Sequence, residues 1–376
     1  MLSSPKSGRG TIAEGGGNCN CRLGDEHGLS KRGRHHGAAL AAARTLSGQG
    51  GHSIDIGDPP RQFAGGMGNL NYLVTLDGKP CVLRRPPLGK LPPGANDMAH
   101  EHTVLSRLWK AFDLAPQSLL YCEDESVLGA HFLIMEYRDD TAIQGGTWPA
   151  QLSETERHDI CALLVKSLAD LHAVDPATVG LGDFGKPDGF LERAIRGWDK
   201  RLGLASDGEP PAPSREVAAW LAANLPGPGD ATLLHNDFKL DNLLLDRNAP
   251  TRAVAMIDWD QATRGDPLFD LATLLSYWAE PGDPDCMTII DQMPTGAPGS
   301  LSRGEARNLY AGLSGRDLSD FRFHRILAMF KLSVVFVQLH AQYRRGTIDN
   351  PRYAPFADAG WGIMQMAHEV ARGRAE

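Results

Sequence analysis

The sequence predicts an α+β protein of two lobes, a small β-rich lobe followed by a larger, mainly helical lobe. Three observations predict this arrangement. The chain has 376 residues, which is too long for one small domain. Two apolar runs, Leu70–Leu76 and Lys79–Arg85, are separated by the turn-forming pair Asp77-Gly78. From about Ser153 onward, the apolar residues recur mainly with helical spacing.

The composition is that of a globular protein. Hydrophobic residues make up 42% and charged residues 22%, which excludes a fully disordered chain, a coiled coil and a collagen-like fibre. The net charge of −8 argues against general binding to nucleic acid, which needs basic side chains to neutralise phosphates. The apolar stretch 326–337 contains Lys331 and is too short to span a bilayer, so we expect no membrane contact.

Residues 1–50 are rich in Gly, Ser, Arg and His, a composition that buries too little apolar surface to offset chain entropy. We expect a disordered, low-complexity extension there. Two alternatives stay open, a start codon placed too far upstream and a transit peptide. No secretory signal is visible, and the six scattered cysteines have no metal-ligand spacing. We therefore expect free thiols in a cytoplasmic protein.

The small lobe is expected over residues 51–137. Asp77-Gly78 favours a tight turn, so the two flanking runs should pair as a β-hairpin. Residues 97–111 have helical apolar spacing, and residues 131–137 form an apolar run typical of a buried strand. A hairpin, a helix and a further strand make a compact α+β unit.

The helical lobe is expected over residues 138–376. Ser153 and Glu156 form a capping-box pattern at the start of a helix that runs to about Leu171. Short strands are expected at residues 243–245 and 254–257. Further helices are expected at residues 267–278 and 321–345.

One segment carries the clearest chemical signal. His235, Asp237 and Asn242 have the spacing H-x-D-x-x-x-x-N and precede an apolar strand. A second apolar strand ends at Asp258. Phosphoryl transfer from a nucleotide needs a carboxylate that orients the attacking hydroxyl, and an amide oxygen and a carboxylate that hold Mg²⁺ over the phosphates. His235–Asn242 and Asp258 together contain the carboxylates and the amide that such a reaction requires.

With these motifs the chain resembles the aminoglycoside phosphotransferase (choline kinase-like) family, which shares the protein-kinase-like fold. It resembles in particular the subgroup related to the kinase-like domain fused to some acyl-CoA dehydrogenases. The resemblance runs over residues 54–358. It rests most strongly on three segments taken together, residues 235–242, 257–260 and 265–272. The matching segments are residues 63–72, 82–87, 100–102, 171–175, 235–242, 257–260 and 265–272.

The resemblance implies a role for each motif residue. Asp237 matches the catalytic base, and Asn242 and Asp258 match the Mg²⁺ ligands. His235 would hold the catalytic loop from within. Lys239 matches a lysine that faces the γ-phosphate in protein kinases, although a solvated loop lysine is the alternative.

The resemblance also implies a nucleotide pocket in the small lobe. Glycines let backbone N–H groups approach phosphates closely, although a plain glycine-rich turn is the alternative. The last small-lobe strand ends where kinases place the hinge, so backbone groups there would meet the adenine edge. The expected residues are Gly65, Gly66, Gly68 and Asn69 in the loop, and Glu136 and Arg138 at the hinge.

A basic residue on the strand Lys79–Arg85 is expected to hold the α- and β-phosphates. Alternation along a strand places Val82 and Arg84 on one face and Arg85 on the other. Val82 matches the residue that covers the adenine in the resembled family. Arg84, on the same face, is therefore the arginine expected to bind the phosphates, and Arg85 is expected to face solvent. The resemblance makes Glu101 the partner of Arg84, whereas surface arginines beside an ordinary helix acid are the alternative.

Two acids near the expected helix 267–278 have structural roles. Asp266 precedes Pro267 and is a natural N-cap. Asp270 lies between apolar residues, where a carboxylate needs hydrogen-bond donors. The resemblance implies that Asp270 accepts hydrogen bonds from the catalytic-loop backbone, and an ordinary helix acid is the alternative.

We therefore expect a kinase that uses ATP (or GTP) and Mg²⁺ to phosphorylate a hydroxyl group of a small molecule. The subgroup resemblance points to a hydroxyacyl compound or hydroxyacyl-CoA as acceptor. The alternatives are an aminoglycoside-type antibiotic kinase and a catalytically silent nucleotide-binding module. The helix expected at 321–345 should line the acceptor pocket. Its charged residues include Arg325, Lys331 and Arg344. They are either solvated surface charges or a basic face that binds an anionic acceptor. The sequence leaves the oligomeric state open.

Overall fold

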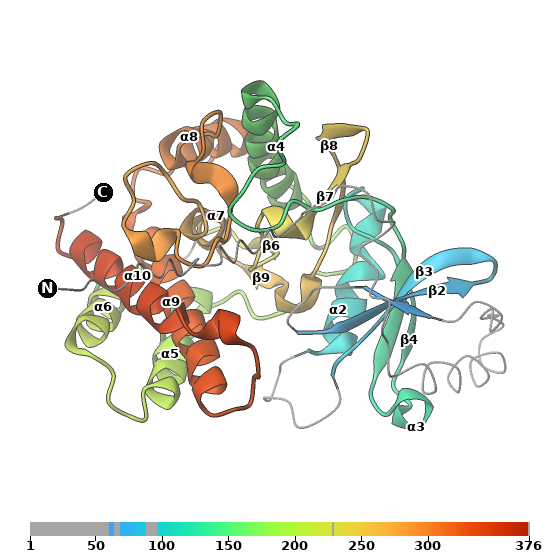
Figure 1. Ribbon diagram of the computed structural model, residues 1–376, viewed down its shortest axis with the longest axis horizontal. Coiled ribbons are helices and arrows are strands. Elements are labelled where there is room, and N and C mark those ends of the chain that lie inside the picture. Colours follow the sequence, from blue (N-terminus) through green and yellow to red (C-terminus); the bar gives the residue numbers. More distant parts are fainter. Residues whose placement is uncertain (1–59, 64–67, 88–95, 228, 375–376) are drawn as a thin grey trace, which may run out of the picture.

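An antiparallel sheet and a helical assembly form the two lobes of the protein (Figure 1). The computed structural model describes residues 60–63, 68–87, 96–227 and 229–374. The extension expected at residues 1–50 lies outside this part of the chain. The fold class predicted from the sequence, α+β with a small β-rich lobe and a larger helical lobe, is confirmed.

The small lobe contains a five-stranded antiparallel sheet, within the described residues, in the order β1-β2-β3-β5-β4. The expected hairpin is present, with Leu76 opposite Lys79 and positive φ at both Asp77 and Gly78. The residue pair therefore supplies the turn geometry that the sequence predicts. The strands are β1 (Arg61–Gln62), β2 (Leu70–Leu76), β3 (Lys79–Arg85), β4 (Ser118–Cys122) and β5 (Phe132–Glu136).

The helix of the small lobe, α2 (Met98–Leu105), is shorter than the stretch 97–111 expected from the sequence. Asp97 caps its start by accepting from the His100 N–H at 3.1 Å. At its end, the Ser106 N–H bonds back to the His102 and Val104 carbonyls, and the chain continues as the 3₁₀ turn Leu108–Lys110. A second short helix, α3 (Glu125–Leu128), connects β4 to β5.

The helical lobe contains two short strand pairs that frame the expected catalytic segment. β6 (Thr232–Leu234) pairs with β9 (Thr263–Gly265), and β7 (Leu243–Asp246) pairs with β8 (Ala249–Met256), both antiparallel. The sequence predicts β7 and β8, whereas the pairing of β6 with β9 depends on contacts between residues about 30 positions apart.

The remaining elements of this lobe are helices. The capping box at Ser153 and Glu156 starts α4 as predicted, with both reciprocal hydrogen bonds present. Asp266 caps α7 by accepting from the Leu268 N–H at 2.8 Å. The helices are α4 (Glu154–His172), α5 (Phe190–Ala205), α6 (Ala212–Ala223), α7 (Pro267–Ser276), α8 (Arg303–Ser314), α9 (Arg322–Arg344) and α10 (Phe356–Ala371).

Helix α9 forms the centre of the helical lobe and packs against α10, α7 and α5. In the described part of the chain it is the one helix long and apolar enough to cross a bilayer, and 61% of its apolar window is buried inside the protein. We interpret α9 as a core helix, since its apolar side chains contact three neighbouring helices. The position of α9 brings the Lys331 ammonium into hydrogen-bond contact with the Asn236 carbonyl of the expected catalytic segment.

Candidate active site

The expected catalytic segment, residues 235–242, is anchored at both ends by strands. β6 leads into it, and β7 leads out of it. The Ile257 N–H at the end of β8 donates to the Asn242 carbonyl at 2.9 Å, which brings Asp258 next to Asn242. Asn236 and Asp258 both have positive φ, at 69° and 71°. Asn and Asp tolerate this conformation better than most side chains, which explains why these two residue types can occupy the two positions.

A buried carboxylate holds the start of the catalytic segment. Asp270 on α7 accepts from the N–H groups of His235 and Asn236 at 2.7 and 2.8 Å. The ring of His172 contacts the same carboxylate at 3.2 Å and the Tyr310 hydroxyl at 2.7 Å. Burial alone would raise the pKa of Asp270, but these donors hold it below its usual range. The backbone contacts have the geometry that the resemblance implies for Asp270.

His235 lies fully inside the lobe. Its Nε2 contacts the Ile257 carbonyl at 2.9 Å, and Nδ1 accepts from the Asp237 N–H at 3.4 Å. Burial lowers the pKa of His235, so the ring is neutral. The histidine therefore connects the catalytic segment to the end of β8 and is placed for support of the loop.

The Asp237 carboxylate is held by two neighbours and remains partly exposed. The Tyr277 hydroxyl donates to Oδ1 at 2.7 Å, and the Lys239 ammonium contacts Oδ2 at 3.2 Å. Burial alone would raise the pKa of Asp237, but the charges of Lys239 and Lys331 outweigh it and hold the pKa below its usual range. The carboxylate is therefore ionised and oriented, as a general base must be.

Lys239 is partly buried rather than solvated. Its Nζ lies 3.2 Å from Asp237 and 3.3 Å from Asp241, and it lies over the Tyr277 ring. Burial lowers the pKa of Lys239, but the two carboxylates outweigh this and raise it above its ordinary value. A fixed positive charge therefore stands beside the expected base.

Asn242 and Asp258 offer oxygen ligands on one side of the segment. The Asn242 amide nitrogen donates to the Asp237 carbonyl at 2.9 Å, which leaves its amide oxygen available. The Asp258 side chain is 39% exposed. No group of three or more His, Cys, Asp or Glu side chains among the described residues is placed to hold a metal. Mg²⁺ commonly uses one or two protein oxygens together with phosphates and water, so this pair fits it.

Arg84 connects the sheet of the small lobe to the expected metal ligand. Its Nε lies 2.8 Å from Glu101 on α2, and its Nη2 pairs with Asp258. The Asn69 amide, turned with its oxygen toward Arg84, accepts from the guanidinium Nη2 at 2.7 Å. Burial lowers the pKa of Arg84, but the two carboxylates outweigh it and raise the pKa above its ordinary value. The Arg84–Glu101 pairing has the register predicted from strand alternation.

The expectation for Arg85 is wrong. Arg85 is buried, whereas the sequence analysis left it to solvent. Its Nη1 donates to the Leu128 carbonyl at 2.7 Å, and its Nε donates to the Pro86 carbonyl at 3.1 Å. Helix α3 supplies the acceptor on this face of the sheet, and the sequence analysis did not predict that helix. Val82, on the other face, is half-buried and packs against the main core.

The glycine loop and the hinge are only partly described. Gly65 and Gly66 lie outside the described residues. Gly68 lies close to Asn96, since a Cβ built on it would be 3.3 Å from the Asn96 amide. At the hinge, the Glu136 N–H is already bonded to the Gln117 carbonyl at 2.8 Å. The expected contact of this backbone with adenine therefore stays a prediction.

The Arg138 side chain joins the two lobes. Its guanidinium donates to the carbonyls of Asp113, Ala115 and Val254, and it forms an ion pair with Glu136 at 3.0 Å. Val254 lies on β8 of the helical lobe, whereas Glu136 ends β5 of the sheet. The Arg138 guanidinium is thus occupied by contacts between the lobes. Only the backbone of Arg138 would be available to bind the nucleotide.

Sequence reasoning missed Lys331 as a site residue. We expected either solvated charges or a basic face on this helix, and neither describes Lys331, which is buried at 8% exposure. Its ammonium donates to the Asn236 carbonyl and lies over the Phe269 ring. Burial lowers the pKa of Lys331. A lone lysine inside a 23-residue apolar helix was the available signal.

Two acids close to the site were also missed, Asp241 and Asp260. Burial raises the pKa of both, and that of Asp260 reaches about 7 because Asp258 adds like charge. Both stand within segments that the sequence analysis singled out, so their carboxylates were visible signals. Together with Asp237 and Asp258 they place four carboxyl groups at the site, among the cationic side chains of Arg84, Lys239 and Lys331.

Comparison with known proteins identifies the family. The family model described as "Phosphotransferase enzyme family" matches residues 60–301. Acyl-CoA dehydrogenase family member 11 of Gallus gallus is 30% identical over 321 residues, which is 83% of this chain and 40% of that protein. Family member 10 of Mus musculus is 30% identical over 309 residues, which is 81% of this chain and 28% of that protein. The chain therefore spans less than half the length of these relatives.

Solved structures share the fold. A protein of Ralstonia eutropha JMP134 described as an aminoglycoside phosphotransferase has a TM-score of 0.73 at 25% identity, covering 90% of this chain and 98% of its own. A thermostable mutant of the aminoglycoside phosphotransferase APH(4)-Ia, in a ternary complex with AMP-PNP and hygromycin B, has a TM-score of 0.53 at 17% identity, covering 88% of this chain and 99% of its own. The fold is kinase-like, and the chain belongs to the phosphotransferase enzyme family.

Proposed function

We propose that the protein transfers the γ-phosphoryl group of ATP, or of GTP, to a hydroxyl group of a small molecule. The observation that carries this proposal is the grouping of Asp237, Asn242 and Asp258. The β7–β8 pairing brings the last two together, and the Asn242 amide bonds to the Asp237 backbone. An oriented carboxylate beside two hard oxygen ligands is the equipment that phosphoryl transfer requires.

The chain's own residues supply the proton acceptor. Asp237 accepts the proton of the acceptor hydroxyl as the oxygen bonds to the γ-phosphorus and the bond to the β-phosphate oxygen breaks. Its carboxylate is suited to this because Tyr277 and Lys239 hold the two oxygens in place. Lys239, with its raised pKa, stays charged beside the transferred group.

Asn242 and Asp258 would hold Mg²⁺, which when bound neutralises negative charge on the phosphates. Arg84 would bind the α- and β-phosphates, because a guanidinium remains charged and donates to two oxygens at once. Glu101 and Asn69 fix its direction. Support for a nucleotide as donor comes from the AMP-PNP bound to the structural neighbour APH(4)-Ia.

The acceptor we propose is a hydroxyacyl compound, such as a hydroxyacyl-CoA. Support comes from the curated relatives, which are named as acyl-CoA dehydrogenases. An aminoglycoside is the alternative, since the Ralstonia eutropha structure is described as an aminoglycoside phosphotransferase.

The test incubates the full chain with Mg²⁺ and ATP or GTP, together with hydroxyacyl-CoAs or aminoglycosides. Mass spectrometry then measures the phosphorylated acceptor, and a coupled assay measures the nucleoside diphosphate. We expect a product only from the hydroxyacyl set. If no acceptor is phosphorylated and no nucleotide is hydrolysed, the protein is a silent nucleotide-binding module instead.

A further inference from the structure

A cavity of about 250 Å³ lies in the helical lobe between α7, α8, α9 and α10. It is separate from the face of α7 that supports the catalytic segment. Asp270 and Tyr277, seven positions apart, contact that segment. Ala272 and Ser276 line the cavity, and the helical period of 3.6 residues places them on the opposite face.

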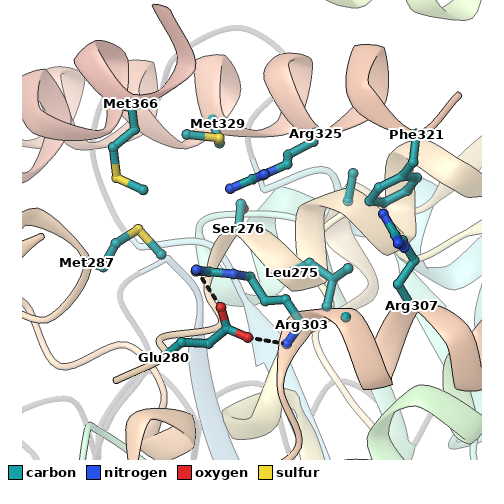
Figure 2. A pocket seen from close by; sticks show the side chains of 12 residues that line it. Leu275, Ser276, Glu280, Met287, Arg303, Arg307, Phe321, Arg325, Met329 and Met366 are labelled. Carbon is teal, nitrogen blue, oxygen red and sulfur yellow. Dashed lines mark hydrogen bonds and ion pairs between the residues drawn. The ribbon is translucent and has the colours of Figure 1, made fainter. Parts of the chain in front are cut away.

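One wall of the cavity is apolar and adaptable. Met287, Met329 and Met366 come from three separate elements and face the same space (Figure 2). Leu275 extends this wall. Methionine side chains are flexible and polarisable, so such a wall accepts apolar chains of varied shape.

The other wall is cationic. Arg303, Arg307 and Arg325 line the cavity, with Glu280 as the single lining carboxylate (Figure 2). Glu280 pairs with Arg303 at 2.7 Å, and Asp283 pairs with the same guanidinium at 2.6 Å. Arg303 is therefore already neutralised by the protein.

The other two guanidinium groups are compensated less, since Asp283 and Glu280 act on Arg325 only from beyond ion-pair distance. Neither Arg307 nor Arg325 forms an ion pair with any residue in the described ranges of the chain. Arg325 is half-buried, and its side chain extends from α9 toward the cavity (Figure 2). Burial lowers the pKa of Arg325, and the like charges of Arg303 and Arg307 add to this, while the carboxylates of Asp283 and Glu280 oppose it only in part. A partly desolvated cation beside like charges is costly unless an anion offsets it.

We propose that this cavity binds an anionic amphiphile, with its carboxylate or phosphate group at Arg325 and its apolar chain along the methionine wall. A guanidinium forms strong charge-assisted hydrogen bonds with such anions. The chain as a whole has a net charge of −8, so the excess of arginine here is local and not a reflection of composition. The same charges repel cationic ligands such as aminoglycosides.

This binding site goes beyond the proposed phosphotransferase activity, and two sources supply its ligand chemistry. The amphiphile is either the far end of the acceptor itself or a separate effector. Ser276 lines the cavity, and the next residue, Tyr277, bonds to Asp237. Either ligand would therefore lie one residue from the partner of the expected base.

The test measures binding of octanoate to the full chain by isothermal titration calorimetry, with octanamide and octylammonium as the neutral and cationic probes. Arg325→Met removes the unpaired charge. Arg344→Met is the matched control, because Arg344 is exposed on the same helix and does not line the cavity. Met366→Trp fills the apolar end. A thermal melt of each variant establishes that it is folded.

We expect octanoate to bind the wild type and the Arg344→Met variant, and octylammonium to bind neither. Arg325→Met and Met366→Trp should each weaken octanoate by about tenfold or more, since one charge-assisted bond or the loss of chain volume is of that order. If octanoate does not bind the wild type at millimolar concentration, or binds folded Arg325→Met equally well, the proposal is wrong.

Phosphorylation of 12-hydroxydodecanoate, whose hydroxyl lies at the opposite end of the chain from its carboxylate, distinguishes the two sources. Competition by octanoate that is lost in Arg325→Met identifies the cavity as the place of the acceptor's anionic end, whereas a change in turnover without competition, also lost in that variant, identifies an effector site. Each of these results supports binding in the cavity. If the wild type has no turnover but binds octanoate through Arg325, the proposed phosphotransferase function fails while the cavity site stands.

Discussion

Arg84 on strand β3 of the small lobe forms an ion pair with Asp258 of the helical lobe. The two residues are 174 positions apart in the chain. A second pair at 2.8 Å joins the same guanidinium to Glu101. One arginine thus couples the sheet, helix α2 and the expected metal ligand, and its geometry leads to the first prediction.

Arg84→Ala should weaken nucleotide binding, because it removes the group expected at the α- and β-phosphates and leaves Glu101 buried without its partner. We expect a loss of at least about tenfold in nucleotide affinity, measured by calorimetry, in line with a charge-assisted contact. Arg85→Ala is the matched comparison. It should lower the melting temperature through loss of the bond to Leu128 but leave nucleotide affinity almost unchanged. The opposite ranking of affinities would place the wrong arginine in the nucleotide site.

The metal dependence should differ between the two expected ligands. Asp258→Ala removes a hard anionic oxygen and should abolish the stabilisation of the protein by Mg²⁺-nucleotide in a thermal melt. Asn242→Ala removes one neutral oxygen and should reduce that stabilisation less. The reference is the same melt with nucleotide and a chelator. If both variants respond to Mg²⁺ as the wild type does, the metal binds elsewhere.

Lys331 should affect turnover without affecting nucleotide affinity. Lys331→Met removes the donor to the Asn236 carbonyl and a positive charge near Asp237. We expect kcat to fall by about tenfold, since an unsatisfied buried acceptor costs about 1–3 kcal/mol and displaces the segment. The affinity for nucleotide, whose phosphates are expected at Arg84, should stay within about twofold. Arg344→Met on the same helix should change neither quantity, and an unchanged kcat in Lys331→Met would show that the lysine has only a packing role.

Asp270 should contribute stability that depends on pH. Its folded-state pKa is lowered by the donors around it, so its contribution is present above the ordinary pKa of about 4 and is lost as the pH falls through the folded value. Asp270→Asn should therefore lower the free energy of unfolding, by about 3–5 kcal/mol for a broken buried contact, and the difference should shrink in acid. Urea denaturation at several pH values measures this. A difference that is independent of pH would mean that Asp270 is not ionised in the fold.

Local sequence patterns predicted the parts of the fold that local chemistry determines. Asp77-Gly78 specifies its turn, and the Ser153 capping box specifies the start of α4, because each acts within a few residues. The end of α2 was misjudged, since apolar spacing continued past Leu105 while the chain turned into a 3₁₀ segment. Periodicity alone does not encode that change.

The residues of the candidate site likewise fall into those that a local sequence pattern predicted and those that it did not. Asp237, Asn242 and Asp258 were found because they lie in one motif and at one strand end. Tyr277 and Lys331 were not, because they reach the segment from 40 and 95 residues away. Such contacts depend on how α7 and α9 pack, and no spacing in the sequence announces them. The burial of Arg85 was missed for the same reason, since helix α3 supplies its acceptor.

The central claim is that Asp237 acts as the general base of a phosphoryl transfer. The most direct measurement is the turnover of Mg²⁺-nucleotide by the Asp237→Asn variant relative to the wild type, with nucleotide affinity measured in parallel. Asparagine keeps the size of the side chain and removes its basicity. The account predicts a fall in turnover of about 10²–10⁴-fold, the usual contribution of a general base, with nucleotide affinity nearly unchanged. Turnover within about threefold of the wild type would contradict it.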